Sequence, residues 1–238
     1  MPDSGSALVI KDVTKIFKAR KRYPGKLFST PTEVLGLHNI NLQVRTGEVV
    51  GLIGGNGSGK TTLLKIMSGA LQPTSGKVMA PSTPRLISLH GLQLPNLSVL
   101  ENTELMLRAH GRGKNETRLE ALELIDQAEL SDKTYLPYNT LSTGMKARLG
   151  FFLATINQPK IILMDEMLSV SDKRFEEKAH HIISAMMANA RGAIIASHSM
   201  TTIRENCTSA IVMHKGSVAF NGSTDDAVAF HLGATEWA

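Results

Sequence analysis

The sequence predicts an α/β protein built around a mainly parallel β-sheet. Short apolar segments of the kind that form buried strands alternate along the chain with longer segments of helical periodicity. The chain has 238 residues, of which 42% are hydrophobic and 20% are charged, so it has enough apolar surface for a packed core and too little charge for disorder. We expect residues 1–238 to form one domain, with room for a smaller lobe.

The composition excludes several classes of protein. A single cysteine, Cys207, cannot form an intrachain disulfide, which suits a reducing compartment. No apolar run approaches the roughly 20 residues that span a bilayer, and the N-terminus lacks the pattern of a signal peptide. The net charge of +5 is compatible with nucleic acid, an anionic membrane surface or a polyphosphate ligand. We therefore expect a soluble, cytoplasmic protein.

Two alternating segments near the N-terminus, 7–13 and 37–44, predict short strands. The segment 18–33 between them contains proline and glycine and predicts a connection. Basic residues gather at its start: Lys15, Lys18, Arg20, Lys21, Arg22 and Lys26. They indicate either a solvated loop or a contact with anionic headgroups, and the sequence leaves both interpretations open.

The middle of the chain predicts a strand, a helix and then a helical region. The β-branched run 47–53 ends in glycines and is followed by a helix over 60–68. Two turn signals flank a short strand within 71–78. Between about 92 and 147, leucines and an isoleucine recur at mostly helical spacing: Leu105, Leu107, Leu119, Leu122 and Ile125.

Strand-like segments return in the last third of the chain. The apolar runs 161–165 and 192–197 predict buried strands, and the stretch between them is helical. The segment 210–222 predicts a hairpin that turns at Lys215-Gly216.

The glycine-rich loop between the strand at 47–53 and the following helix matches the pattern G-x-x-x-x-G-K-[ST]. Its glycines let successive N–H groups converge on phosphate oxygens at the start of a helix. The lysine is expected to reach the β- and γ-phosphates, and the first threonine to bind Mg²⁺. The second threonine is expected to lie near the α-phosphate. These residues are Gly54, Gly55, Asn56, Gly57, Ser58, Gly59, Lys60, Thr61 and Thr62.

Charged and titratable side chains follow the two later strands. Asp165 and Glu166 come directly after four apolar residues, and His198 follows the strand at 192–197. In open α/β sheets, ligands bind at the carboxyl ends of the strands, so these side chains are expected near the phosphates. Asp165 is suited to Mg²⁺, Glu166 to polarising the attacking water, and His198 to the γ-phosphate end.

The segment Leu141-Ser142-Thr143-Gly144-Met145-Lys146 resembles the L-S-G-G-Q signature of ABC-type ATPases. The resemblance covers about residues 7–222 because the phosphate loop, the signature, the acidic pair and His198 occur in the family's order. It implies a P-loop NTPase core with an N-terminal antiparallel β subdomain and an inserted helical subdomain at about 92–147. It also implies that Ser142, Thr143 and Gly144 bind the nucleotide held by a second copy. A helix beginning at Ser142 suits that role.

Departures from the usual signature narrow the resemblance. Thr143 and Met145 replace the glycine and the glutamine that the usual signature has at these positions. The segments 142–151 and 165–172 are similar to the corresponding segments of capsular polysaccharide exporters. Exporters of O-antigen and teichoic acid are close to the same pattern.

Two of the family's positions are ambiguous in this chain. The family usually has a glutamine that contacts Mg²⁺ and the membrane partner, and here Gln93 is the candidate, with His90 as the alternative. For the aromatic side chain that stacks on adenine, Phe17 has the expected offset, while Tyr23 lies in the same segment. A role for Phe17 in the core is the alternative interpretation.

The resemblance implies the ATP-hydrolysing subunit of an exporter, with ATP and Mg²⁺ as cofactors. Two copies would pair head to tail and drive a separate integral-membrane permease, which would make most of the contacts with the polysaccharide. The protein would then lie peripherally on the cytoplasmic face of the cell membrane and would not contact nucleic acid directly. Three alternatives remain: the same family with another cargo, a soluble ABC-type ATPase acting on nucleic acid or ribosomes, and a non-hydrolysing regulator. The last is disfavoured because Glu166 and His198 are both present.

Overall fold

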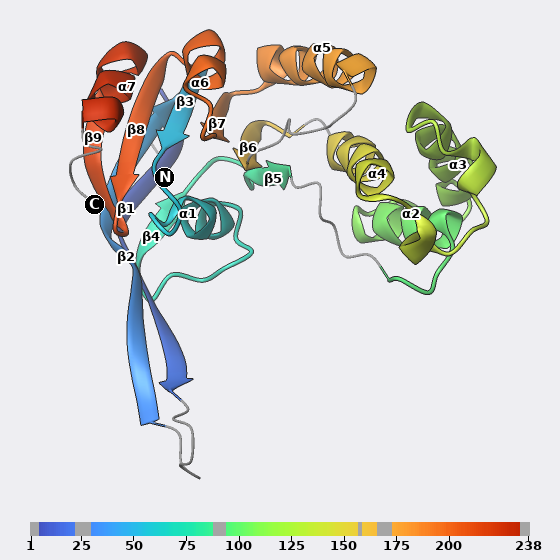
Figure 1. The fold of residues 1–238 in the computed structure, drawn as a ribbon, viewed down its shortest axis with the longest axis horizontal. Helices are drawn as coiled ribbons and strands as arrows, with labels where there is room; N and C mark the ends of the chain where they lie inside the picture. The colour runs from blue at the N-terminus through green and yellow to red at the C-terminus, as the bar shows by residue number, and fades with distance from the viewer. Residues whose placement is uncertain (1–4, 22–29, 88–93, 157–158, 166–172, 234–238) are drawn as a thin grey trace. The chain divides into compact units, whose positions relative to one another are not determined.

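The computed structural model describes residues 5–21, 30–87, 94–156, 159–165 and 173–233. The chain divides into two compact units. The first contains residues 1–86, 159–166 and 190–238, and the second contains residues 87–158 and 167–189. Most residues of the strands in Figure 1 belong to the first unit, and most of the helical residues belong to the second.

A three-stranded antiparallel sheet begins the first unit, in the order β2-β1-β4. Its strands are β1 (Ser6–Lys21), β2 (Thr30–Arg45) and β4 (Ser75–Met79). The prediction that 18–33 forms only a connection is wrong at both ends, because Lys18 pairs with Glu33 and Lys21 with Thr30. The hairpin of β1 and β2 therefore continues well beyond the pairing of β1 with β4, which ends at Thr14 and Ser75 (Figure 1).

The second sheet has six strands in the order β5-β6-β7-β3-β8-β9. The pairs β6–β7, β7–β3 and β3–β8 are parallel, while β8 and β9 form an antiparallel hairpin. The predicted fold class, a mainly parallel sheet with an N-terminal antiparallel sheet, is confirmed. The strands are β3 (Glu48–Ile53), β5 (Arg85–Ile87), β6 (Ile161–Asp165), β7 (Gly192–Ala196), β8 (Ser209–His214) and β9 (Ser217–Ser223).

The described residues of the first unit form three helices: α1 (Lys60–Met67), α6 (Met200–Asn206) and α7 (Thr224–Gly233). The first was predicted from the sequence and the other two were not. All five residues of β7 are buried, as expected for a parallel strand covered on both faces. An apolar cluster joins the antiparallel sheet, the central strands and α1, and includes Leu8, Ile10, Val50, Leu52, Leu63 and Ile194.

The second unit contains the helices α2 (Val99–Ala109), α3 (Thr117–Gln127), α4 (Thr143–Thr155) and α5 (Lys173–Asn189). The helical interpretation of 92–147 is confirmed for the described residues, although α4 continues to Thr155. Phe151, Phe152 and Phe175 pack edge to face, with ring centroids 5.4–6.1 Å apart. Within the described part of the chain, no helix combines the length and apolar character needed to cross a bilayer.

Two polar side chains hold the start of α2. Ser98 and Glu101 form a capping box, in which each side chain accepts a hydrogen bond from the backbone of the other. Asn102 is only 1% exposed, and its amide group donates to the carbonyl oxygens of Leu94, Leu97 and Ser98 while accepting from Leu94 N. The loop that precedes α2 is thus fastened to the helix.

Candidate functional site

The phosphate loop joins β3 to α1 at the carboxyl edge of the parallel sheet. Its turn is formed by Gly54, Gly57 and Gly59, which have φ values of 154°, 75° and 107°. Glycine reaches these angles without the steric cost that a side chain adds. The amide of Ser58 donates to Gly55 O at 3.2 Å, which closes the turn.

The glycines of this loop divide into two kinds. A side-chain carbon at Gly54 would lie 2.5 Å from Met213 O, and one at Gly59 would lie 2.7 Å from Leu37 Cδ2. Carbons at Gly55 and Gly57 would meet nothing within 4 Å. One side of the loop is therefore packed against the sheet, and the other has space for a ligand.

Lys60 and the first turn of α1 make this space suitable for an anion. Lys60 is 6% exposed, and its ammonium group donates to Gly54 O at 2.6 Å and to Gly55 O at 3.2 Å. No side chain caps the helix and no acidic residue lies in its first turn. The hydroxyl of Ser58 is buried and has no hydrogen-bond partner among the described residues. Backbone N–H groups, a hydroxyl and a buried cation thus meet at one end of a helix.

Two glycines distant in sequence support the loop from behind. The amide of Gly216, in the turn of the β8–β9 hairpin, donates to Ser58 O at 2.9 Å, and Gly216 O accepts from His38 N at 2.8 Å. Gly36 in β2 lies against both, because a side-chain carbon at Gly59 would be 3.2 Å from Gly36 O and one at Gly216 would be 2.7 Å from it. The sequence predicts Gly216 in a hairpin turn, but it assigns neither Gly36 nor Gly216 a role at the phosphate loop. For Gly36, an isolated glycine among apolar residues is the available signal.

Asp165 and His198 lie at the same edge of the sheet as the loop. Asp165 ends β6 and is in register with Ala196 of β7, which is in turn in register with Leu52 of β3. Ser197 N donates to Leu52 O at 3.4 Å, and the exposed His198 follows directly. The parallel register thus brings both residues to the edge where β3 enters the phosphate loop. Glu166, the next residue after Asp165, lies outside the described residues.

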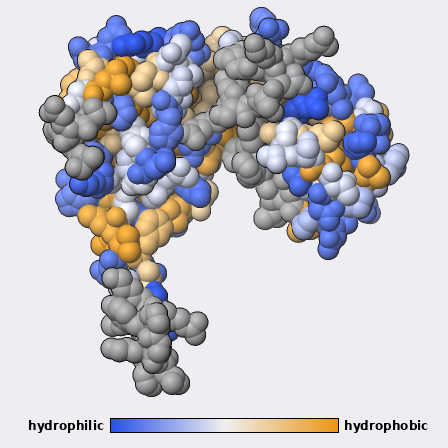
Figure 2. Space-filling view, viewed as in Figure 1, coloured by the Kyte–Doolittle hydropathy of each residue, from blue (hydrophilic) through white to orange (hydrophobic). Residues whose placement is uncertain are grey.

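Phe17 lies on β1 beside Gly36. A side-chain carbon at Gly36 would be 2.5 Å from Phe17 Cε2, so the ring covers the backbone that also touches Gly59. The ammonium group of Lys15 is 5.4 Å from the ring centroid, and the ring is 37% exposed. Figure 2 shows hydrophobic surface on this part of the hairpin, where Val34 and Leu35 are also exposed. Phe17 is therefore a surface aromatic next to the phosphate loop and not a core residue. Its alternative, Tyr23, lies outside the described residues.

The signature segment belongs to the second unit. Ser142 is the N-cap of α4, and its hydroxyl accepts from Met145 N at 3.3 Å, which confirms the predicted helix start. Ser142 and Thr143 are exposed, and a side-chain carbon at Gly144 would meet nothing within 4 Å. This helix end is open to a ligand from outside the unit. Gln93 and its alternative His90 lie outside the described residues.

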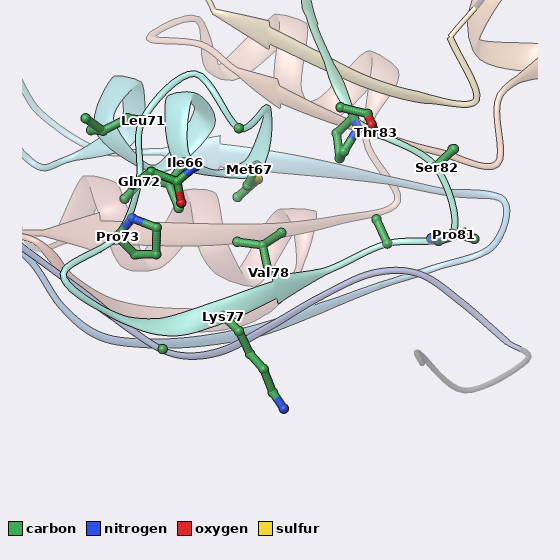
Figure 3. A pocket seen from close by; sticks show the side chains of 14 residues that line it. Ile66, Met67, Leu71, Gln72, Pro73, Lys77, Val78, Pro81, Ser82 and Thr83 are labelled. Carbon is green, nitrogen blue, oxygen red and sulfur yellow. The ribbon is translucent and has the colours of Figure 1, made fainter.

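A pocket of about 550 Å³ lies between α1, β4 and the segment at 80–84. Figure 3 shows Ile66, Met67 and Val78 lining it, while the side chain of Lys77 extends away from it. The lining mixes apolar side chains with polar ones, including Gln72, Ser82 and Thr83, but its lysine points outward and supplies no positive charge for a phosphate. Of the described residues, those at the phosphate loop are therefore better suited to a nucleotide.

Comparisons with known proteins point to one family. The family model of the ABC transporter matches residues 37–169. The teichoic acids export ATP-binding protein TagH of Levilactobacillus brevis is 33% identical over 99% of this chain and 67% of its own length. TagH of Listeria monocytogenes serotype 4b is 35% identical over 80% of this chain and 57% of its own length. TagH of Staphylococcus saprophyticus is 30% identical over 91% of this chain and 84% of its own length.

Solved structures show the same architecture. A dimeric, post-hydrolysis state of the ATP-binding cassette MJ0796 with ADP and Pi has a TM-score of 0.72. It is 26% identical, covering 91% of this chain and 98% of its own. An ATP-binding subunit of an ABC transporter has a TM-score of 0.73 at 22% identity, over 96% of this chain and 94% of its own, and supports the fold alone. The chain therefore belongs to the ABC transporter family, and the relatives described are ATP-binding proteins of teichoic acid export.

Proposed function

We propose that the chain hydrolyses ATP to energise export of a cell-surface polysaccharide, of the teichoic acid or capsular type, through a separate permease subunit. The observation that carries this proposal is the open side of the phosphate loop at Gly55 and Gly57, above the uncapped start of α1. The similarity to teichoic acid export proteins over 99% of the chain supports the cargo class. The chain spans 57–84% of the length of the three relatives described, so their cargo and partners enter here only as support.

The residues around the loop fit a nucleoside triphosphate. Backbone N–H groups of 54–62 would face the phosphate oxygens, and the unpartnered Ser58 hydroxyl would donate to one of them. The ammonium group of Lys60 donates hydrogen bonds to Gly54 O and Gly55 O. With a nucleotide bound, it would donate to the β- and γ-phosphates instead. The ring of Phe17, beside Gly36, would stack on the base.

The oxygen ligands at this edge of the sheet fit Mg²⁺. The hydroxyl of the exposed Thr61 and the carboxylate of Asp165 are hard oxygen ligands. Mg²⁺ usually keeps several water ligands, so a site with only a few protein ligands suits it. Gln93 would add a third. When bound, the ion would neutralise charge on the phosphates. Glu166 would orient and polarise the attacking water, and His198 would hydrogen-bond the γ-phosphate.

A second copy of the chain would complete the site. Ser142, Thr143 and Gly144 are open at the start of α4 and would bind the nucleotide held by the partner copy. The dimeric cassette structure, at 26% identity, supports this arrangement. The helices of the second unit would pass the closing motion to the permease. The complex would place this chain peripherally on the cytoplasmic face of the cell membrane.

Turnover of Mg-ATP by the purified chain and its Glu166→Gln variant tests the hydrolytic role. We expect the variant to bind ATP and accumulate as a dimer while turnover falls about 10²–10⁴-fold, the usual contribution of a general base. Glu123→Gln, at an exposed position on α3, is the matched control and should change neither property. Turnover that survives Glu166→Gln, or a variant that stays monomeric with ATP and permease, would contradict the proposal.

The cargo is tested in the organism that encodes the chain. Deleting the gene should remove one class of surface glycan, and the wild-type chain should restore it while a Lys60→Ala chain should not. A deletion strain with unchanged teichoic acid and capsule would point to another cargo.

A further inference from the structure

The part of β1 that leads to Phe17 is fastened to the segment between α1 and β4. Thr74, in that segment, donates its backbone N–H to Thr14 O at 2.8 Å. Its hydroxyl accepts from Ile16 N at 3.0 Å and donates to Ile16 O at 3.4 Å. The backbone of β1 is therefore held on both sides of Lys15, directly before the aromatic residue.

Strand β2 leaves space for the Phe17 ring at Gly36. The register of β1 and β2 shifts between Lys15 and Ile16, which leaves Gly36 as an extra residue in β2, as in a β-bulge. A side-chain carbon at Gly36 would lie 2.5 Å from Phe17 Cε2, and one at Gly59 would lie 3.2 Å from Gly36 O. The ring thus lies across a backbone that also contacts the phosphate loop, and a side chain at Gly36 would displace it.

The side chain of Lys15 contacts the same ring. Lys15 and Phe17 are two residues apart on β1, so their side chains leave the strand on the same face. The ammonium group lies over the ring, 5.4 Å from its centroid, which is within the range of a cation–π contact. It also donates to Gln72 O at 2.7 Å, in the segment between α1 and β4 that Figure 3 shows. This hydrogen bond holds the cation in place above the ring.

The position of the cation decides which face of the ring can meet a base. Because Lys15 occupies one face, only the opposite face of Phe17 can stack on another ring. The faces of an aromatic ring are negative and repel each other in direct stacking. A cation on one side draws electron density towards itself, so the opposite face repels an electron-rich purine less. Lys15 and Gly36 together therefore fix the orientation of the ring and favour stacking on its free face.

We propose that Lys15 is a positioning residue of the nucleotide site, which holds the Phe17 ring in the orientation that stacks on the base. This rests on the proposed function, since it requires a nucleotide at the phosphate loop with its base at Phe17. Lys15 acts through the ring and does not itself touch the nucleotide. Its effect is therefore confined to ligands that carry a base, and it disappears when the ring is removed.

Calorimetry on the purified chain with Mg²⁺ and either a non-hydrolysable ATP analogue or tripolyphosphate separates binding of the base from binding of the phosphates. We expect Lys15→Met to bind the analogue about 2–5-fold more weakly, the usual strength of an exposed cation–π contact. Its affinity for tripolyphosphate should equal that of the wild type, which also shows that the variant is folded. Lys15→Arg should keep wild-type affinity for the analogue, because a guanidinium group can make both contacts. Lys11→Met, at an exposed position on β1, removes the same charge and should change neither affinity.

A double-mutant cycle with Phe17→Leu tests whether Lys15 acts through the ring. Phe17→Leu should weaken binding of the analogue, and adding Lys15→Met to it should cost nothing further. An equal loss with and without the ring, or an equal loss for tripolyphosphate, would overturn the inference, because either would show a direct effect of the charge.

Two other results would also overturn it. Tighter or unchanged binding of the analogue by Lys15→Met would mean that the ammonium group competes with the base or plays no part. Wild-type affinity of Phe17→Leu would mean that no base stacks on the ring. Absence of analogue binding by the wild-type chain would instead contradict the proposed function.

Discussion

Replacing Gly144 by alanine is expected to stabilise the chain and to inactivate it. Gly144 is the second residue of α4, its φ is not left-handed, and an added carbon meets nothing within 4 Å. Alanine at such a position stabilises by about 0.4–1 kcal/mol. For a chain of this size, that raises Tm by about 1–4 °C. The same carbon would separate the helix start from the partner's phosphates. Losing one charge-assisted hydrogen bond, worth about 1.5–3 kcal/mol, would slow turnover about 10–150-fold.

Thermal unfolding and steady-state ATP turnover, measured on the same preparation, test this pair of effects. Gly113→Ala is the control, because its added carbon also has space, with Glu116 Oε2 at 3.9 Å, and its turnover should stay at the wild-type level. A Gly144→Ala chain that is stabilised and still turns over normally would refute the role of α4 at the partner's nucleotide. A destabilised chain would show that the space beside Gly144 is filled.

Three further predictions concern stability. Gly216→Ala should cost about 2–4 kcal/mol in urea unfolding, because φ is +79° and the added carbon lies 2.7 Å from Gly36 O; an unchanged midpoint would contradict the close approach. Asn102→Ala should cost about 2–4 kcal/mol by the same assay, because the backbone groups of Leu94 lose their partner, and a loss below 0.5 kcal/mol (about one weak hydrogen bond) would contradict this. Burial raises the pKa of the Cys207 thiol to about 12. Between pH 9 and 12 the thiol of the unfolded chain therefore loses its proton before that of the folded chain, and the free energy of unfolding falls as the pH rises. Cys207→Ala should show a shallower fall, and identical pH profiles of the two chains would argue against a buried thiol.

The parts of the fold and site that the sequence predicts are those defined by local pattern. The phosphate loop needs its glycines and Lys60 within eight consecutive residues, and β6 and β7 are short apolar runs that end in Asp165 and near His198. Because parallel pairing brings the carboxyl ends of these strands together, the predicted strand positions are enough to place Asp165 and His198 at one edge of the sheet.

The parts that the sequence does not predict depend on long-range contacts. Lys18 and Lys21 lack a local strand pattern, and they are in β1 because β2 offers a partner for each of them. Helix α7 is short, and its buried Ala227 and Val228 gain their stability from the sheet more than from helix propensity.

The contacts of Gly216 with Ser58 and His38 mean that the turn between the last two strands is part of the scaffold of the loop before α1. A loop already held in its shape forfeits little conformational entropy when an anion arrives, which favours tight and rapid capture. Sequence changes around residue 216 should therefore alter nucleotide affinity although that turn faces away from the ligand. Surveys of natural variants that look only at ligand-contacting positions would overlook them.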